Sequence, residues 1–227
     1  MRINSSQEIG RTRGPKFRLP FWKRVIDVTG AATLLLAASP LMLAVAAVIR
    51  WRMGSPVIFR QVRPGLGERP FQMLKFRTMN DRRNPDGTLA PDRERLTRLG
   101  RWLRASSLDE LPQMVNILRG DMSFVGPRPL LMEYLAHYTP RERARHSVRP
   151  GITGLAQVCG RNILSWDERL ELDAQYVERL SLGLDMWIVW RTALAVITAS
   201  GVSVDSAEAE GNLVQIRRAR NGASGKQ

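Results

Sequence analysis

The feature that most constrains the fold is an uncharged stretch at residues 28–49, with Ser39 and Pro40 near its middle. At about 1.5 Å per helical residue, it is about long enough to cross a hydrocarbon core of ~30 Å. Basic residues lie outside both ends, namely Lys23, Arg24, Arg50 and Arg52. Because basic flanks tend to stay cytoplasmic, they draw both ends of the stretch to the same side. Pro40 would kink or break a helix near the bilayer midplane, so we expect a re-entrant membrane helix hairpin over residues 19–52.

Other structures are compatible with this stretch. It could form a straight single span or a buried helix of a soluble core. A cleaved signal peptide fits poorly, because the apolar run is long and lacks a small-residue cleavage site at its end. In the hairpin, the backbone groups freed at the break need partners in lipid, and the Ser39 hydroxyl is one candidate. Labelling of engineered cysteines near residues 10 and 56 in sealed vesicles distinguishes the hairpin from the span.

The charge balance favours an anionic partner. The 227 residues include 35 Lys and Arg against 21 Asp and Glu, for a net charge of +14. Beside an apolar anchor, an anionic membrane surface is the simplest partner, since each juxtamembrane basic residue contributes about 1 kcal/mol. Nucleic acid is disfavoured, because the aromatic residues do not alternate with the basic ones and no helix-turn-helix or zinc pattern occurs. The lone Cys159 excludes an internal disulfide and fits a reducing compartment.

The chain divides into four segments without internal repeats. Residues 1–18 are polar and basic, so we expect a mobile N-terminus. The apolar segment at residues 19–52 follows. Residues 53–200 have the size of a catalytic domain, which we expect on the cytosolic side at the membrane interface. Residues 201–227 carry separate acidic and basic patches and predict a loosely ordered tail.

The pattern within the central segment predicts an α+β fold that is mainly helical. Short apolar runs around the turn at residues 64–67 predict a β-hairpin. Apolar residues at helical spacing predict amphipathic helices beginning near residues 93, 111 and 165. The apolar segment at residues 184–197 either lies in the membrane interface or packs on the core.

The chemical candidate is the pair Asp109 and Glu110. Ser107 with Glu110 could be no more than a capping box. Pro112 weakens that interpretation, because proline suits the first position of a helix better than its interior. Two neighbouring carboxylates before such a helix cannot point at the same spot, which suits one nucleophile and one cation ligand. An ionised aspartate can attack phosphorus without a general base, and a carboxylate can bind Mg²⁺ together with substrate phosphates and water.

A second candidate is Arg128, which lies between Pro127 and Pro129. The two prolines restrict the backbone around a guanidinium that can bind phosphate in a bidentate manner. The alternative is an extended proline-rich connector with an exposed arginine. The basic, turn-rich stretches at residues 149–154 and 160–161 could likewise be loops alone.

Several short motifs occur along the chain in a fixed order. They are Lys23-Arg24 with Asp27, Ser39-Pro40, Lys75-Phe76-Arg77-Thr78-Met79, Ser107-Leu108-Asp109-Glu110-Leu111-Pro112-Gln113, Gly120-Asp121-Met122-Ser123, Val125-Gly126-Pro127-Arg128-Pro129 and Pro150-Gly151-Ile152-Thr153-Gly154. In this order they resemble a known family, the monotopic phosphoglycosyl transferases, which are bacterial sugar transferases. The resemblance covers about residues 20–197, and the order of the motifs is far more specific than any one of them.

The resemblance implies transfer of a sugar 1-phosphate from a nucleotide sugar, usually a UDP-sugar, to a polyprenyl phosphate, with release of UMP. It implies a ping-pong mechanism in which Asp109 attacks the sugar-bearing phosphate and carries a covalent phosphosugar. Glu110 matches the Mg²⁺-binding position, and the metal would neutralise charge on the diphosphate. The motif containing Arg128 matches the contact to the nucleotide. The other substrate-binding candidates are Lys75, Arg77, Arg104 and Arg161.

The resemblance also implies a monotopic protein on the cytoplasmic face of the bacterial inner membrane, at the first membrane step of exopolysaccharide or glycoconjugate assembly. Longer members carry additional segments, and this chain resembles the minimal form. Cys159 is a departure, because members commonly have asparagine there. The sequence leaves open the sugar and a possible homo-oligomer. The alternative function is a non-catalytic membrane-tethered basic binding module or scaffold, for which Asp109→Asn would leave the biological role intact.

Overall fold

The computed structural model describes residues 20–160, 164–198 and 213–224. For residues 221–224 it describes the backbone alone. Helices dominate the described chain, and the predicted α+β class is confirmed. The predicted β-hairpin is present and longer than expected. It pairs β1 (Ile58–Pro64) with β2 (Pro70–Phe76) in antiparallel register through the short 3-10 turn η1 (Leu66–Glu68).

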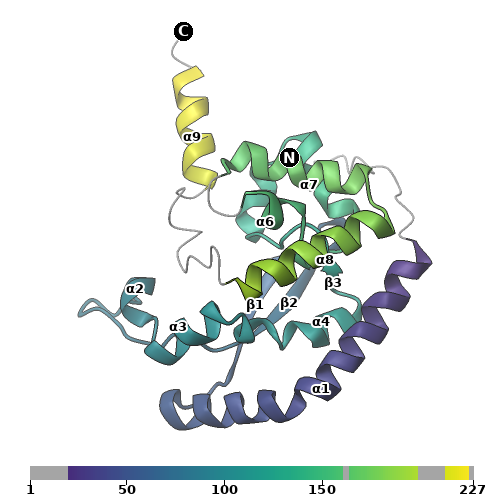
Figure 1. Cartoon of the computed structure of the whole chain (residues 1–227). Helices are drawn as coiled ribbons and strands as arrows, with labels where there is room; N and C mark the ends of the chain where they lie inside the picture. The colour runs from purple at the N-terminus through teal and green to yellow at the C-terminus, as the bar shows by residue number, and fades with distance from the viewer. Residues whose placement is uncertain (1–19, 161–163, 199–212, 225–227) are drawn as a thin grey trace, which may run out of the picture.

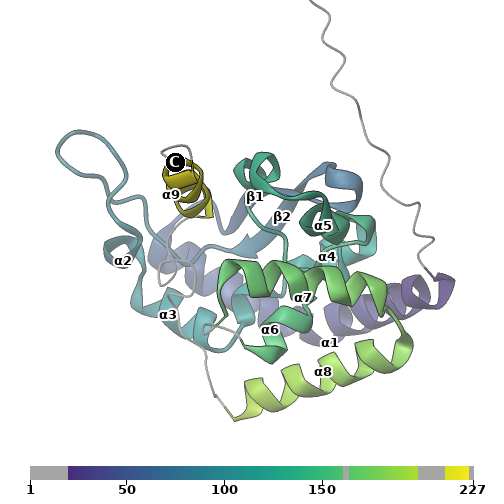
Figure 2. The same cartoon turned by 90° about the horizontal axis from the view of Figure 1, so that it is seen from above.

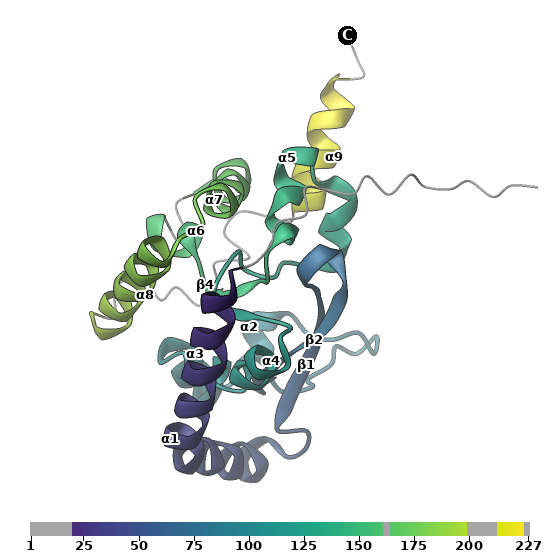
Figure 3. The same cartoon turned by 90° about the vertical axis from the view of Figure 1, so that its right-hand side faces the viewer.

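The long apolar helix α1 (Phe21–Met53) is continuous by hydrogen bonding and bends in its middle, so its halves point in different directions (Figures 1 and 3). Pro40 lies inside the helix and has no N–H to donate to the carbonyl of Leu36. The Ser39 hydroxyl donates to that carbonyl instead, at 2.9 Å. The predicted break is therefore a bend in one helix, and the Ser39 hydroxyl bonds the carbonyl that Pro40 leaves without an N–H donor.

Most of α1 is exposed, and it is the one described helix that is long and apolar enough to span a membrane. Its buried positions are few: Lys23, Asp27, Ala31, Val45 and Ile49. Ala31 packs with Met114, Ile117 and Met122 in one core cluster, whereas Val45 and Ile49 pack with Phe76 and Leu103 in another. The helix therefore covers the domain along one narrow face and leaves a broad apolar face uncovered.

The predicted helices are present with small changes at their ends. The pattern after residue 93 forms α2 (Asp92–Arg95) and α3 (Arg98–Ala105), and the one after residue 111 forms α4 (Gln113–Arg119). Near residue 165, Ser165 and Glu168 form the predicted capping box of α7 (Trp166–Glu178). The shorter elements between them are η2 (Leu108–Glu110), η3 (Met132–His137), α5 (Pro140–Arg143), η4 (Ala144–Ser147) and α6 (Leu155–Cys159).

The segment at residues 184–197 belongs to α8 (Leu182–Ile197), which lies beside α7 (Figure 2). Ile188 on α8 packs with Tyr176 and Val177 on α7. The opposite side of α8 is apolar and exposed, with Met186 at 55% and Trp190 at 62% of their full exposure. One face of the helix therefore packs on the core, which is one of the two arrangements considered from the sequence, and the other face remains uncovered.

Two features were not predicted. Strands β3 (Ser123–Val125) and β4 (Gly151–Thr153) pair in parallel, although each has only three residues. Within the expected tail, α9 (Leu213–Ser224) packs its first turn against the domain and then projects outward (Figures 1 and 3). The predicted mobile N-terminus at residues 1–18 lies outside the described residues.

Candidate functional site

Asp109 and Glu110 lie in η2, a single 3-10 turn between α3 and α4. Ser107 precedes the turn in a left-handed conformation, with φ of 57°, which is unusual for a residue with a side chain. Its hydroxyl makes no capping bond, so the capping-box interpretation is wrong. As predicted, α4 begins directly after Pro112. The carboxylate pair is therefore on a tight connection between two packed helices.

Two cations hold the Glu110 carboxylate. Lys75, near the end of β2, lies with its Nζ 2.6 Å from Glu110 Oε1, and Arg128 lies with Nη2 at 3.0 Å from the same oxygen. Burial opposes the charge of Glu110, but Arg128 and Lys75 outweigh this effect and lower its pKa to about 2. Glu110 is therefore ionised and fixed in place at neutral pH.

Asp109 is more deeply buried than its neighbour, with 6% of the residue exposed. Burial raises its pKa, and Glu110 acts in the same direction, whereas the charges of Lys75, Arg104 and Arg128 lower it. Among the described residues, Asp109 forms none of the close ion pairs that hold Glu110. Within the described part of the chain, the two carboxylates thus differ: Glu110 is locked between cations, and Asp109 lies in their field without an ion pair of its own.

The structure brings three of the predicted basic residues around this pair, namely Lys75, Arg104 and Arg128. Arg104 on α3 also donates through Nε to the Thr78 hydroxyl at 3.2 Å. Arg77 is not part of the group. All three of its guanidinium nitrogens are used by protein oxygens, including the Ser55 carbonyl at 3.1 Å and the Asp81 carboxylate at 2.5 Å.

Arg77 was predicted to bind substrate, and the structure gives it a structural role. Its side chain holds the segment that follows α1. Arg161 lies outside the described residues, and its predicted contact stays a prediction.

The loop that carries Arg128 follows β3 and is held by close backbone contacts. Gly126 N–H donates to the Thr153 carbonyl at 2.9 Å, and Gly151 N–H donates to the Pro127 carbonyl at 3.0 Å. A Cβ on Gly151 would lie 2.2 Å from the nitrogen of Gly126. Glycine is therefore required where the two strands meet, and the short parallel pair fixes the base of the Arg128 loop.

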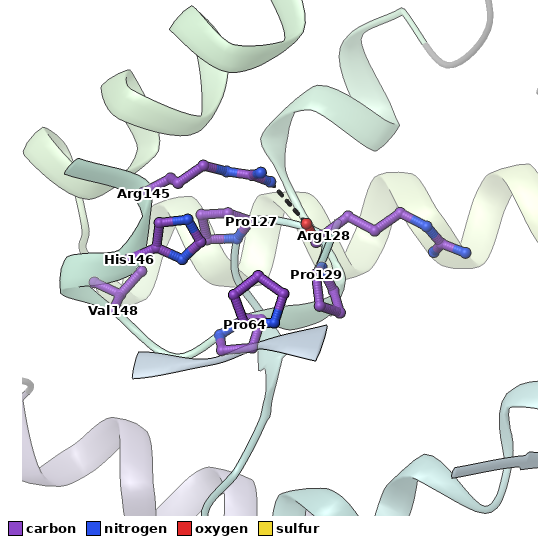
Figure 4. A pocket seen from close by; sticks show the side chains of 8 residues that line it. Pro64, Pro127, Arg128, Pro129, Arg145, His146 and Val148 are labelled. Atoms are coloured by element: carbon purple, nitrogen blue, oxygen red, sulfur yellow. Dashed lines mark hydrogen bonds between the residues drawn. The ribbon is translucent and has the colours of Figure 1, made fainter. Parts of the chain in front are cut away.

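Arg145 is a residue that sequence reasoning missed. It donates at 2.7 Å to the Arg128 carbonyl (Figure 4), forms an ion pair with Asp173 at 2.8 Å and donates to the Tyr138 hydroxyl at 2.8 Å. The Arg145 and Asp173 side chains are only 2% and 3% exposed. A signal for it existed, because Asp173 interrupts the apolar face that Leu170 and Val177 form on α7.

A small pocket adjoins this loop, lined by Pro64, Pro127, Arg128, Pro129, Arg145, His146, Val148 and Pro150 (Figure 4). The Arg128 side chain extends away from the pocket, whereas the His146 ring forms part of its wall. Burial and the adjacent Arg145 lower the pKa of His146 to about 3. His146 is therefore neutral at physiological pH and adds no charge to the site.

Polar groups at the start of α1 hold two elements that connect to the site, α4 and β3. Arg24 donates to the carbonyls of Ile117 and Leu118, near the end of α4, at 2.6 and 2.8 Å. Asp27 accepts from the Ser123 hydroxyl at 2.9 Å and from the Phe124 N–H at 3.0 Å. The long apolar helix therefore also positions α4, which follows the carboxylates in the chain, and β3, which leads into the Arg128 loop.

The donor set around Asp109 and Glu110 limits how a metal could bind. Among the described residues, no group of three or more His, Cys, Asp or Glu side chains could hold a metal ion. Mg²⁺ often relies on one or two carboxylates together with substrate phosphates and water. The residues present fit an ion of that kind, with substrate supplying most of its ligands.

Comparison with known proteins agrees with the predicted family. The chain matches the family described as "Bacterial sugar transferase" over residues 18–199. It is 51% identical over 180 residues to "Uncharacterized sugar transferase EpsL" of Bacillus subtilis, covering 79% of this chain and 89% of that protein. It is 43% identical over 194 residues to a "UDP-glucose:undecaprenyl-phosphate glucose-1-phosphate transferase" of Caulobacter vibrioides, covering 81% and 73%.

A third relative is named for a different sugar. The "UDP-N-acetylgalactosamine-undecaprenyl-phosphate N-acetylgalactosaminephosphotransferase" of Aeromonas hydrophila is 39% identical over 189 residues, which cover 80% of this chain and 45% of that longer protein. The chain therefore belongs to the bacterial sugar transferase family. The prediction of an enzyme, a glycosyl-1-phosphate transferase, is confirmed over the alternative of a non-catalytic module.

Proposed function

We propose that this enzyme transfers a sugar 1-phosphate from a UDP-sugar to undecaprenyl phosphate, releasing UMP, as the first membrane step of glycan assembly. The main support for the proposal is that the carboxylates of Asp109 and Glu110 have different electrostatic surroundings. Lys75 and Arg128 lock Glu110, whereas Asp109 lies in the same cationic field without a close ion pair to any residue that the structure describes. A nucleophile needs an oxygen that is not held by a cation, and a diphosphate needs cations beside it.

In the first step, a carboxylate oxygen of Asp109 attacks the sugar-bearing phosphorus of the UDP-sugar. The bond between that phosphorus and the oxygen bridging the two phosphates breaks, and the bridging oxygen leaves on UMP. The phosphosugar is then joined to Asp109 as an acyl phosphate. Lys75, Arg104 and Arg128 supply positive charge around the transferred phosphoryl group, where electrostatic stabilisation provides most of the catalysis.

In the second step, a phosphate oxygen of undecaprenyl phosphate attacks the same phosphorus. The bond to Asp109 breaks, the free carboxylate is restored, and the sugar leaves on a lipid diphosphate. Because each substrate reacts separately with the same carboxylate, the kinetics are ping-pong.

Mg²⁺ enters the proposal as an ion that binds together with the nucleotide sugar. Glu110 is the carboxylate that would hold it, with the remaining ligands from the diphosphate and water. Bound there, the ion would neutralise charge on the diphosphate. Glu110 is held by Lys75 and Arg128 through Oε1, so its second oxygen is the one that would face the ion.

The proposed location is the cytoplasmic face of the inner membrane, with α1 entering and leaving through the same leaflet. Two uncovered apolar faces support this arrangement. Leu36 and Leu43 on α1 are 77% and 72% exposed, and Ile197 at the end of α8 is 80% exposed. The bend in α1 is the feature that a re-entrant helix requires, and the chain's charge of +14 suits an anionic leaflet.

The test is the intact mass of the full chain after incubation with Mg²⁺ and single UDP-sugars, without lipid. The panel includes UDP-glucose and UDP-N-acetylgalactosamine, the donors for which the relatives are named. We expect one phosphosugar to add to the wild type and to leave when undecaprenyl phosphate is supplied. Asp109→Asn should show neither adduct nor turnover, whereas the control Asp92→Asn, at an exposed carboxylate, should behave as wild type.

Two results would count against the proposal. Lipid-dependent UMP release by Asp109→Asn at the wild-type rate would show that Asp109 is not the nucleophile. Absence of both adduct and UMP release with every donor would show that UDP-sugars are not the substrates.

A further inference from the structure

The helix α9 lies beyond the segment that matches the family, since the match ends at residue 199 and the helix begins at Leu213. Its first turn is nevertheless part of the core. Leu213 is fully buried, and the Tyr134 hydroxyl hydrogen-bonds with its backbone. Further along, Arg217 and Arg220 make ion pairs with the domain, and the end of the helix projects away from it (Figures 1 and 3).

The cluster that receives Leu213 is directly connected to the Arg128 loop. Leu130 and Leu131 follow Pro129 in the sequence, and both pack against this cluster. The full set of buried members is Tyr134, Tyr138, Trp166, Leu170 and Leu213, with Val214 and Ile216 of α9 partly buried beside them. The apolar side of α9 therefore packs in the same cluster as the segment leaving the Arg128 loop.

A second connection runs through ion pairs. Arg217 lies with Nη2 at 2.5 Å from Glu142 and at 2.8 Å from Asp167. The Glu142 side chain is only 9% exposed, and its other oxygen accepts from the Thr139 N–H. Glu142 belongs to α5, which continues directly into the turn η4 that carries Arg145. Arg217 therefore fixes the element that leads to Arg145.

Arg145 completes the connection to the site. It donates to the Arg128 carbonyl at 2.7 Å, while the Arg128 guanidinium contacts Glu110 at 3.0 Å. Arg145 also donates to the hydroxyl of Tyr138, whose ring packs in the cluster with Leu213. The links are direct contacts, except that Glu142 and Arg145 are joined through three peptide bonds of the chain from α5 into η4. Most of the side chains are buried, so displacement on one side is transmitted to the other.

We propose that α9 braces the Pro127–Pro129 loop and thereby sets the affinity of the site for the nucleotide sugar. Arg217 is the positioning residue, acting through Glu142 and Arg145 on Arg128. The effect on affinity rests on the proposed function, because it takes Arg128 as a contact to the nucleotide sugar. The claim that α9 holds the Pro127–Pro129 loop in place does not rest on the proposed function.

The test uses Arg217→Ala in the full chain, with Arg218→Ala as the matched control. Arg218 is adjacent to Arg217 and exposed, and its substitution by alanine removes the same charge from the same helix. Two experiments are made: amide hydrogen exchange of residues 121–131 without substrate, and steady-state kinetics that give KM and kcat for the UDP-sugar. Arg217→Lys is the rescue variant, because a lysine ammonium can also lie between two carboxylates.

We expect Arg217→Ala to raise exchange in residues 121–131 and to raise KM by about fivefold, with kcat within about twofold of wild type. Arg218→Ala should change neither quantity, and Arg217→Lys should restore most of both. Unchanged exchange in Arg217→Ala would overturn the brace. Faster exchange with unchanged KM would overturn the effect on affinity and leave α9 as a structural element alone.

The exchange measurement keeps the two proposals separate. If the wild type shows no turnover with any UDP-sugar, the proposed function fails, while exchange in Arg217→Ala against Arg218→Ala still decides whether α9 holds the loop.

Discussion

The buried ion pair between Lys23 and Asp185 offers a test of how the two apolar helices are joined. Lys23 in the first turn of α1 lies with its Nζ 2.5 Å from Asp185 Oδ2 on α8, and the two side chains are only 6% and 8% exposed. The Tyr176 hydroxyl donates to the other oxygen of Asp185 at 2.7 Å. Lys23→Met would leave the carboxylate buried with this hydroxyl but without its cation.

The size of the effect follows from the geometry. At an effective dielectric constant of ~20, two unit charges 2.5 Å apart attract by about 7 kcal/mol, most of which offsets the cost of removing both from water. Removing one partner strands the other, which typically costs about 3–5 kcal/mol. For a chain of this size, each kcal/mol lowers the melting temperature by roughly 2–4 °C. We therefore expect Lys23→Met to melt roughly 10 °C below the wild type.

The assay is thermal unfolding of purified protein in one detergent. Arg50→Met, at an exposed basic residue near the other end of α1, is the control and should melt close to wild type. The double variant Lys23→Met with Asp185→Leu should recover much of the loss, because no charge is stranded and Tyr176 can donate to the Val125 carbonyl, 3.1 Å away. A single variant within 2 °C of wild type, or a double variant no more stable than the single, would refute the reasoning.

Three other predictions concern the site and the bend in α1. The folded-state pKa of Glu110, about 2, lies below its ordinary value of 4.5, so its charge stabilises the fold above pH ~4.5 and this contribution is lost as pH falls toward 2. Glu110→Gln should therefore be less stable than wild type by about 2–3 kcal/mol at pH 7 and converge with it near pH 2, as followed by unfolding at each pH. Ser39→Ala removes the donor to the Leu36 carbonyl and should cost about 1 kcal/mol in the same thermal assay, whereas unchanged melting would show that the bond is dispensable. Chelation of Mg²⁺ should abolish UMP release, and full activity in chelator would remove the metal from the mechanism.

Local sequence signals predicted the elements that depend on local interactions. Ser165 and Glu168 formed the expected capping box, and Pro112 marked the start of α4. Ser39 and Pro40 marked the bend in α1 and even the hydrogen bond that covers it. In each case the partners lie within a few positions in the sequence, so the pattern contains both halves of the interaction.

The unpredicted features depend on partners distant in the sequence. β3 pairs with β4 across about 28 residues, and neither strand is long enough to show a strand pattern. Arg145 finds Asp173 and the carbonyl of Arg128, and Arg77 turns toward the carbonyl of Ser55, 22 residues earlier in the chain. For a single arginine, the sequence shows the charge but not the acceptors it will meet. Basic residues were therefore easy to propose as phosphate ligands and hard to separate into structural and catalytic ones.

The start of α1 shows why the apolar helix and the site are one mechanical unit. Lys23, Arg24 and Asp27 lie within its first two turns, and each contacts a different element: α8, α4 and β3. One of these elements follows Glu110 directly, and another leads into the Arg128 loop. In the proposed function, the depth of α1 in the leaflet therefore fixes the height of Asp109 relative to the lipid phosphate. The polar first turns hold the site, and in the proposed arrangement the apolar remainder of the helix would set its distance from the membrane.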